Sequence, residues 1–245
     1  MIRVDARARL GRPDAQLAVR LLANDDGEAR AHWERVLADG GFDALLDEPA
    51  LAAALRRRGL GAHASLPLFC YVVVRHALRA AGEGDRRLAD YLASLVMQFG
   101  LRDRARRVAA VDDEVYETLA ELLAAAEADD RQGNARRALL VRAHLGEVAL
   151  WRSGLFAEGA GRARRGGPDL AYYEAMGRRG FRLAAAHRLA AEHGLASLFA
   201  AAADRFDVLR AALSEVSDVL LFPDRLSPDR VRRAVADPTR WRLSA

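Results

Sequence analysis

The clearest pattern in the chain is the stretch AADRFDVLRAALSEVSDVL, residues 202–220. Its apolar positions recur in alternating steps of four and three residues, and they are Ala202, Phe206, Leu209, Leu213, Val216 and Leu220. Such spacing keeps the apolar side chains on one side of an α-helix, as in the seam of a coiled coil. The stretch therefore predicts a helix within 197–221 that packs its stripe against other helices, and Pro223 ends it.

The composition extends this helical reading to the rest of the chain. Alanine and leucine dominate the apolar residues, which make up 51% of the 245 residues, and isoleucine occurs only at Ile2. Residues that favour helices are thus abundant and residues that favour strands are scarce. No stretch of useful length alternates apolar and polar residues as a half-buried strand does. We expect an all-α, multi-helix bundle of about eight to ten helices, mostly antiparallel neighbours because the loops are short.

Turn and capping signals divide the chain into helices. The first is expected to begin near Asp14, and the second to follow Asp25–Asp26 and end at Gly40–Gly41. Ser65 and Asp85 are the expected N-caps of the next long helices. The helices expected to carry the core span 66–81, 86–99, 113–127, 135–151, 170–193 and 197–221.

We expect one domain over residues 1–245, with a weak subdivision near 108–112 as the alternative and 237–245 as a loose C-terminal tail. One packing feature stands out within it. Gly177, Gly180 and Ala184 line one side of the predicted helix 170–193. A mid-helix glycine costs about 1 kcal/mol relative to alanine. Close packing of another helix is the expected reason, and a cofactor groove or a kink near Gly180 is the alternative.

The charge pattern gives little support for a polyanionic partner. All 38 basic residues are arginine and 34 residues are acidic, so the net charge is only +4. An arginine-rich chain without lysine is typical of a bacterial-type, GC-rich composition. The small surplus supplies little non-specific attraction to nucleic acid, which remains an unfavoured partner.

Other features point to a cytoplasmic protein. Cys70 is the only cysteine, which excludes an intrachain disulfide. Residues 1–10 lack the apolar region of a signal peptide. The longest apolar run, Leu66 to Val74, is about half the ~20 residues that a membrane span needs. We therefore expect no membrane association.

The strongest candidate for chemistry is the pair His144 and Glu147. They lie three residues apart and share one face of the predicted helix 135–151, with Leu140 and Trp151 on the same face. A histidine and a carboxylate framed by apolar residues can act as acid and base, or bind a ligand. The alternative is a purely structural hydrogen bond. Common nucleotide-binding, hydrolase and metalloprotease motifs are absent from the sequence.

Weaker candidates lie elsewhere in the chain. His76 follows the apolar run 68–74, which also contains Tyr71, and a partly buried structural histidine is the more common state. A glycine-rich loop before Pro168 is a candidate anion-binding site because guanidinium groups and free backbone N–H groups bind phosphate. Its arginines are Arg162, Arg164 and Arg165. A solvated loop is the alternative.

These observations favour a non-enzymatic interaction or scaffold protein that binds a protein partner or its own copy. Neither a cofactor nor a metal is predicted. The first alternative is a helical enzyme or small-molecule binder whose pocket uses His144 and Glu147. The second is an arginine-mediated binder of nucleic acid or a phosphorylated ligand.

Overall fold

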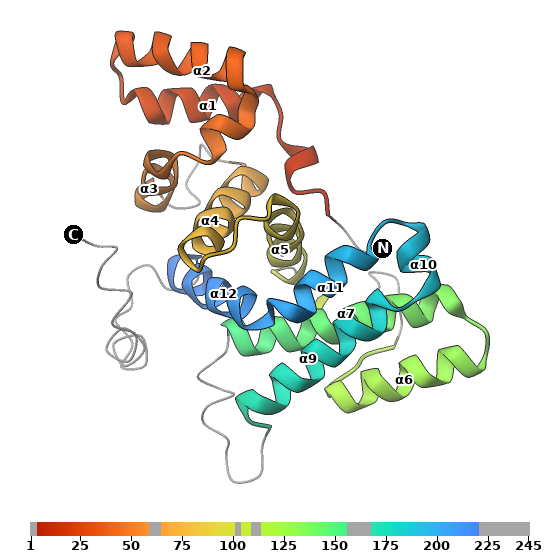
Figure 1. Ribbon diagram of the computed structural model, residues 1–245. Coiled ribbons are helices and arrows are strands. Elements are labelled where there is room, and N and C mark those ends of the chain that lie inside the picture. Colours follow the sequence, from red (N-terminus) through yellow and green to blue (C-terminus); the bar gives the residue numbers. More distant parts are fainter. Residues whose placement is uncertain (1–3, 59–64, 101–103, 109–113, 156–167, 221–245) are drawn as a thin grey trace.

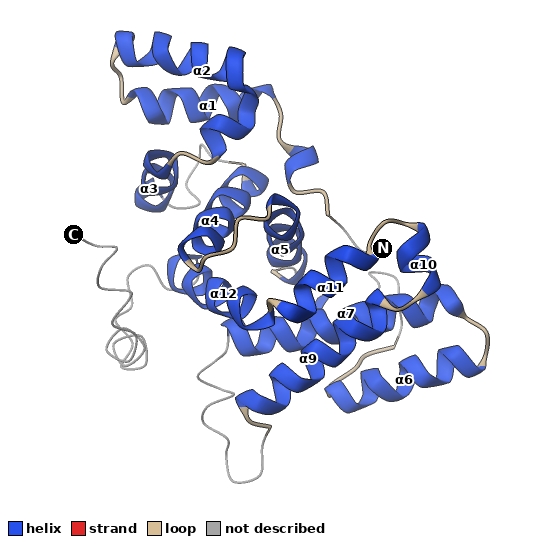
Figure 2. Cartoon of the chain, in the orientation of Figure 1, coloured by secondary structure: helices blue, strands red, loops and turns tan. Residues whose placement is uncertain are grey.

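The computed structural model describes residues 4–58, 65–100, 104–108, 114–155 and 168–220. These residues form eleven α-helices and no strand, which confirms the all-α, multi-helix bundle (Figure 2). The helices are α1 (Arg12–Ala23), α2 (Gly27–Leu46), α3 (Pro49–Arg58), α4 (Leu66–Ala80), α5 (Arg86–Phe99), α6 (Leu119–Arg131), α7 (Ala135–Leu155), α9 (Leu170–Ala185), α10 (Arg188–Glu192), α11 (Ala196–Asp204) and α12 (Phe206–Leu220). The expectation of antiparallel neighbours stays a prediction.

Several helices begin where the sequence places an N-cap. The side chains of Asp26, Ser65 and Asp85 accept hydrogen bonds from backbone N–H groups in the first turns of α2, α4 and α5. Each bond satisfies a donor that the helix itself leaves without a partner. The predicted starts of α4 and α5 are therefore confirmed.

The predicted helix 113–127 begins too early. Residues 114–117 are irregular, and α6 begins at Leu119. Thr118 is the cap: its Oγ1 accepts from the N–H of Glu121, and the Glu121 carboxylate accepts from the N–H of Thr118. This reciprocal capping box fixes the start of the helix.

The predicted helices 170–193 and 197–221 are each two helices. The first is divided after Ala185, where Nδ1 of His187 accepts from the N–H of Leu189 and caps α10. The second is divided at Arg205, between α11 and α12. The apolar stripe nevertheless faces the core on both sides of the break, since Ala202, Phe206 and Leu213 are fully buried.

Helix α2 also departs from its predicted end. Gly41 has a φ of +71°, which breaks the helix where the sequence expects a stop. The chain then returns to helical geometry and continues to Leu46. The first helix begins two residues before Asp14, at Arg12.

The close packing predicted for the glycine side of α9 is present. A Cβ added to Gly180 would lie 2.6 Å from the backbone nitrogen of Gly146 in α7. A Cβ added to Gly177 would lie 2.2 Å from the ring of Phe206. Helix α9 continues through both glycines to Ala185, so neither a kink nor a cofactor groove is needed to explain them (Figure 1).

Helix α4 lies at the centre of the molecule and packs against α3, α5 and α12 (Figure 1). All residues from Leu68 to Val74 are buried. Burial raises the pKa of the Cys70 thiol to about 12, so the thiol stays protonated and unreactive. Among the helices that the structure describes, none is both long and apolar enough to cross a membrane.

The α1–α2 pair is joined to the bundle by two aspartates at the end of α2 and four arginines that bond to them. These residues, here called the anchor cluster, are Asp43 and Asp47 with Arg7, Arg75, Arg79 and Arg86. Arg75 donates to Asp47 at 2.8 Å and Arg86 donates to it at 2.6 Å. Partial burial alone would raise the pKa of Asp47, but these two guanidinium groups outweigh it and lower the pKa to about 2.

Candidate functional site

The structure brings a tyrosine to the predicted pair on α7. His144 and Glu147 have side chains that are only 2% and 12% exposed, with 3.6 Å between Nδ1 and Oε2. From α5, the hydroxyl of Tyr91 donates to Oε1 of Glu147 at 2.9 Å. We call Tyr91, His144 and Glu147 the buried trio.

Aromatic rings surround the buried trio. The ring of Phe99 lies edge-on to His144 and to Trp151, with 5.5 Å between centroids in both cases. Burial, with the neighbouring Glu147 carboxylate, raises the pKa of Tyr91 well above its ordinary value. The phenol therefore stays protonated and donates to the carboxylate.

The imidazole ring of His144 is almost completely buried. Among the residues that the structure describes, no group bonds to either ring nitrogen. The 3.6 Å to Glu147 is too long for a hydrogen bond. A buried polar group without a partner costs about 1–3 kcal/mol, so a small polar molecule beside this ring would be stabilised. The described residues contain no group of three metal-ligating side chains, so the trio lacks the ligands of a structural zinc site.

The other two candidates on α4 lie apart from the buried trio. Nε2 of His76 is 3.1 Å from the carbonyl oxygen of Leu46, and burial lowers the pKa of this histidine. The Arg7 guanidinium lies 5.9 Å above the ring of Tyr71, whose pKa burial raises to about 12. Within the described part of the chain, neither residue bonds to the trio. The contact with the Leu46 carbonyl oxygen is compatible with a structural role for His76, which stays a prediction.

Some predicted residues lie outside the described part of the chain. The anion-binding candidates Arg162, Arg164 and Arg165 are among them, as are the tail 237–245 and all but the first residue of the alternative subdivision near 108–112. The helix that follows the loop begins at its expected cap, since Asp169 accepts from the N–H of Tyr172 at 2.8 Å.

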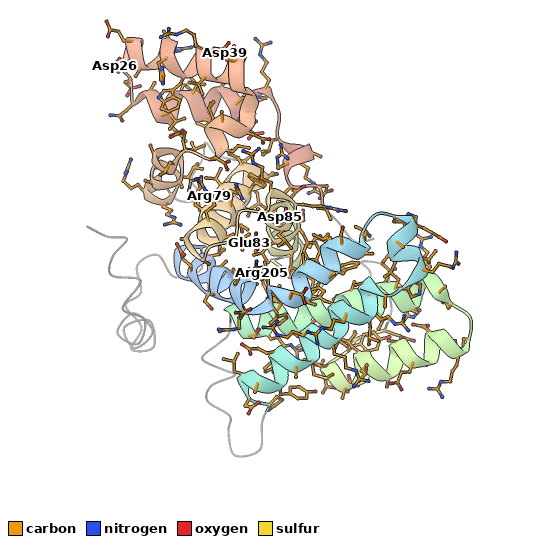
Figure 3. All side chains as sticks on the ribbon, viewed as in Figure 1. Asp26, Asp39, Arg79, Glu83, Asp85 and Arg205 are labelled. Atoms are coloured by element: carbon orange, nitrogen blue, oxygen red, sulfur yellow. The ribbon has the colours of Figure 1, made fainter. Side chains whose placement is uncertain are left out.

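A second candidate site, which the sequence reasoning missed, lies on α2. A shallow, open hollow of about 360 Å³ lies along the surface of α2. We call this surface the outer face of α2, and its residues are His32, Arg35, Val36, Asp39 and Gly40. Figure 3 places Asp39 on the far side of α2 from the rest of the chain.

The outer face of α2 belongs to a helix with little of its own burial. Between Gly27 and Gly40 no residue is buried, and the helix packs chiefly against α1. The partly buried Trp33 and Leu37 pack against the core cluster, and so does Val36 at the inner edge of the outer face. The one signal in the sequence is the spacing of Arg35 and Asp39, four residues apart and opposite in charge.

Comparison with known proteins adds no relative to this description. No family model, no curated protein and no solved structure matches the chain.

Proposed function

We propose that the protein is a helical interaction module that presents the outer face of α2 to a partner. The observation that carries this proposal is the exposure of the helix from Gly27 to Gly40. An isolated helix of this length is only marginally stable in water. Helix α1 packs against one side of α2, and a partner on the outer face would stabilise the helix by packing against another side.

The anchor cluster supports the same proposal. It fixes the base of α2 to α4 and α5, where Leu45 and Leu46 are buried. The part of α2 before Gly41 projects from this base (Figure 1). The packing of α1 along this part of α2 and the anchored base limit the conformational entropy lost on binding, which favours affinity.

Site-specific photo-crosslinking in the host tests this function. A photoreactive residue in place of Arg35 reports contacts on the outer face. The same residue in place of Arg30, whose side chain is 62% exposed, is the matched control. It lies on the same helix, about 140° around the axis from position 35.

The proposal predicts a covalent adduct from position 35 and little from position 30. Mass spectrometry of the adduct then identifies the partner. Equal yields at both positions, or none at either, would contradict the proposal.

A second candidate function, ligand binding by the buried trio, has its own support. His144 is buried with both ring nitrogens free of hydrogen bonds among the described residues. Native mass spectrometry of protein purified from its own host would show a stoichiometric extra mass that His144→Phe removes. If no mass is present and His144→Phe is more stable than the wild type, the histidine is a core residue without a ligand.

A further inference from the structure

We infer that the partner on the outer face of α2 is a second copy of this chain, bound through the same face. This inference rests on the proposed function and names its partner.

The charges on the outer face can pair with the same charges on a second, antiparallel copy of α2. Arg35 and Asp39 are one turn apart on the same side of α2. A two-fold axis at the level of residue 37 runs a second α2 in the opposite direction. Each Arg35 then faces Asp39 of the other copy, and two identical ion pairs form. Symmetric interfaces of soluble dimers are built in this way, from one self-complementary patch.

Both charges are available for this pairing. Among the described residues, no ion pair involves Arg35 or Asp39; Arg35 makes one 3.3 Å bond to the carbonyl oxygen of Ala31 in its own helix. Elsewhere on the same helix, Arg30 is already paired with Glu34 at 3.0 Å. Of these two pairs, the one that lines the hollow therefore has no ion-pair partner within the described part of the chain.

The shape of the outer face suits a second helix. Val36 packs in part against the core cluster and borders the charged stripe on one side, and Gly40 contributes no side chain at its end. Small residues at a helix contact allow the shorter interaxial distances, near 8 Å. Only a small apolar area lies between the ion pairs, so the dimer depends strongly on charge and weakens with added salt.

Charge exchange between positions 35 and 39 tests this inference. Arg35→Asp places two aspartates opposite each other at both contacts, and Asp39→Arg places two arginines there. Like charges in direct opposition are expected to weaken the dimer by roughly tenfold or more. The double variant Arg35→Asp/Asp39→Arg restores both ion pairs. Arg30→Asp carries the same change of charge on another side of α2 and is the control.

Native mass spectrometry and sedimentation velocity supply the readout. We expect dimers for the wild type, the double variant and the control, and monomers for each single variant. An equimolar mixture of the two single variants should form a mixed dimer, because each supplies the charge that the other lacks. This result needs both single variants to be folded, so it excludes misfolding as the cause of their monomeric state.

Two outcomes overturn the inference. One is a wild type that stays monomeric at every concentration, and the other is single variants that dimerise as well as the wild type. A monomer that still gives an adduct with another protein from position 35 would refute the second copy and leave the proposed function intact. A monomer without that adduct would refute both.

Discussion

The contact between α7 and α9 allows one substitution to be predicted in detail, Gly180→Ala. A Cβ at this position lies 2.6 Å from the backbone nitrogen of Gly146 and 3.0 Å from the carbonyl oxygen of Arg142. The nearest obstacle is backbone, which cannot rotate away as a side chain does. Helix α9 must therefore move outward, and every contact along its side loses part of its dispersion energy.

The free-energy terms oppose each other. Alanine improves helix propensity by about 1 kcal/mol. Overpacking a tight core costs about 1–3 kcal/mol, and a backbone clash is expected at the upper end or beyond. We expect Gly180→Ala to lower the free energy of unfolding by about 2 kcal/mol.

Urea denaturation followed by circular dichroism measures this change as a lower midpoint with an unchanged slope. Gly27→Ala is the control, because an added Cβ there meets nothing within 4 Å. Its stability should stay within about 0.5 kcal/mol of the wild type. A Gly180→Ala protein as stable as the Gly27→Ala protein would refute the close approach of α7 and α9.

Three further predictions follow from buried contacts. Gly177→Ala should destabilise the fold by about 2–3 kcal/mol, and Phe206→Leu, which removes the obstructing ring, should recover part of this loss in a double-mutant cycle; purely additive effects would contradict the contact. The folded-state pKa of Asp47 is about 2 against 3.8 for the unfolded chain, so its stabilisation is complete above pH 3.8 and is lost as the pH falls through 2. Asp47→Asn should therefore cost about 1 kcal/mol at pH 7, after allowance for solvent screening, and less at pH 3; urea midpoints with an equal cost at both pH values would contradict this. Cys70 should react with a thiol reagent only after unfolding, and rapid reaction of the native protein would show that α4 is not closed.

Local signals explain why most helix starts were predictable from the sequence. An N-cap acts within three residues of its own position, so Ser65 and Asp85 carry the whole signal themselves. The exception, α6, has two competing signals. Asp112–Asp113 resembles a helix start, yet the capping box of Thr118 and Glu121 determines the observed one.

Helix ends inside a continuous apolar stripe were not predictable. The stripe 202–220 keeps its spacing across Arg205, although the backbone leaves the helix there. Apolar periodicity indicates which side chains are buried. It does not reveal a break in the helix when the apolar side chains on both sides of the break still point toward the core. His187 gave no warning either, because histidine is not among the strongly preferred caps.

The buried trio was predictable only in part. His144 and Glu147 share a face by their spacing along one helix, which the sequence contains. Tyr91 joins them because α5 packs beside α7, and the choice of neighbouring helices depends on the whole fold. The outer face of α2 was not predicted for a related reason. Which side of a helix stays exposed depends on the helices that pack against it, and the sequence of the helix alone does not specify them.

Hydrogen–deuterium exchange at low and high protein concentration is the sharpest test of the proposed dimer, because it locates association as well as detecting it. A dimer formed through the outer face of α2 should slow the exchange of α2 residues 27–40 at high concentration and leave α10, the internal reference, unchanged. Slower exchange elsewhere, or α2 exchange that does not depend on concentration, would contradict a dimer formed through the outer face of α2.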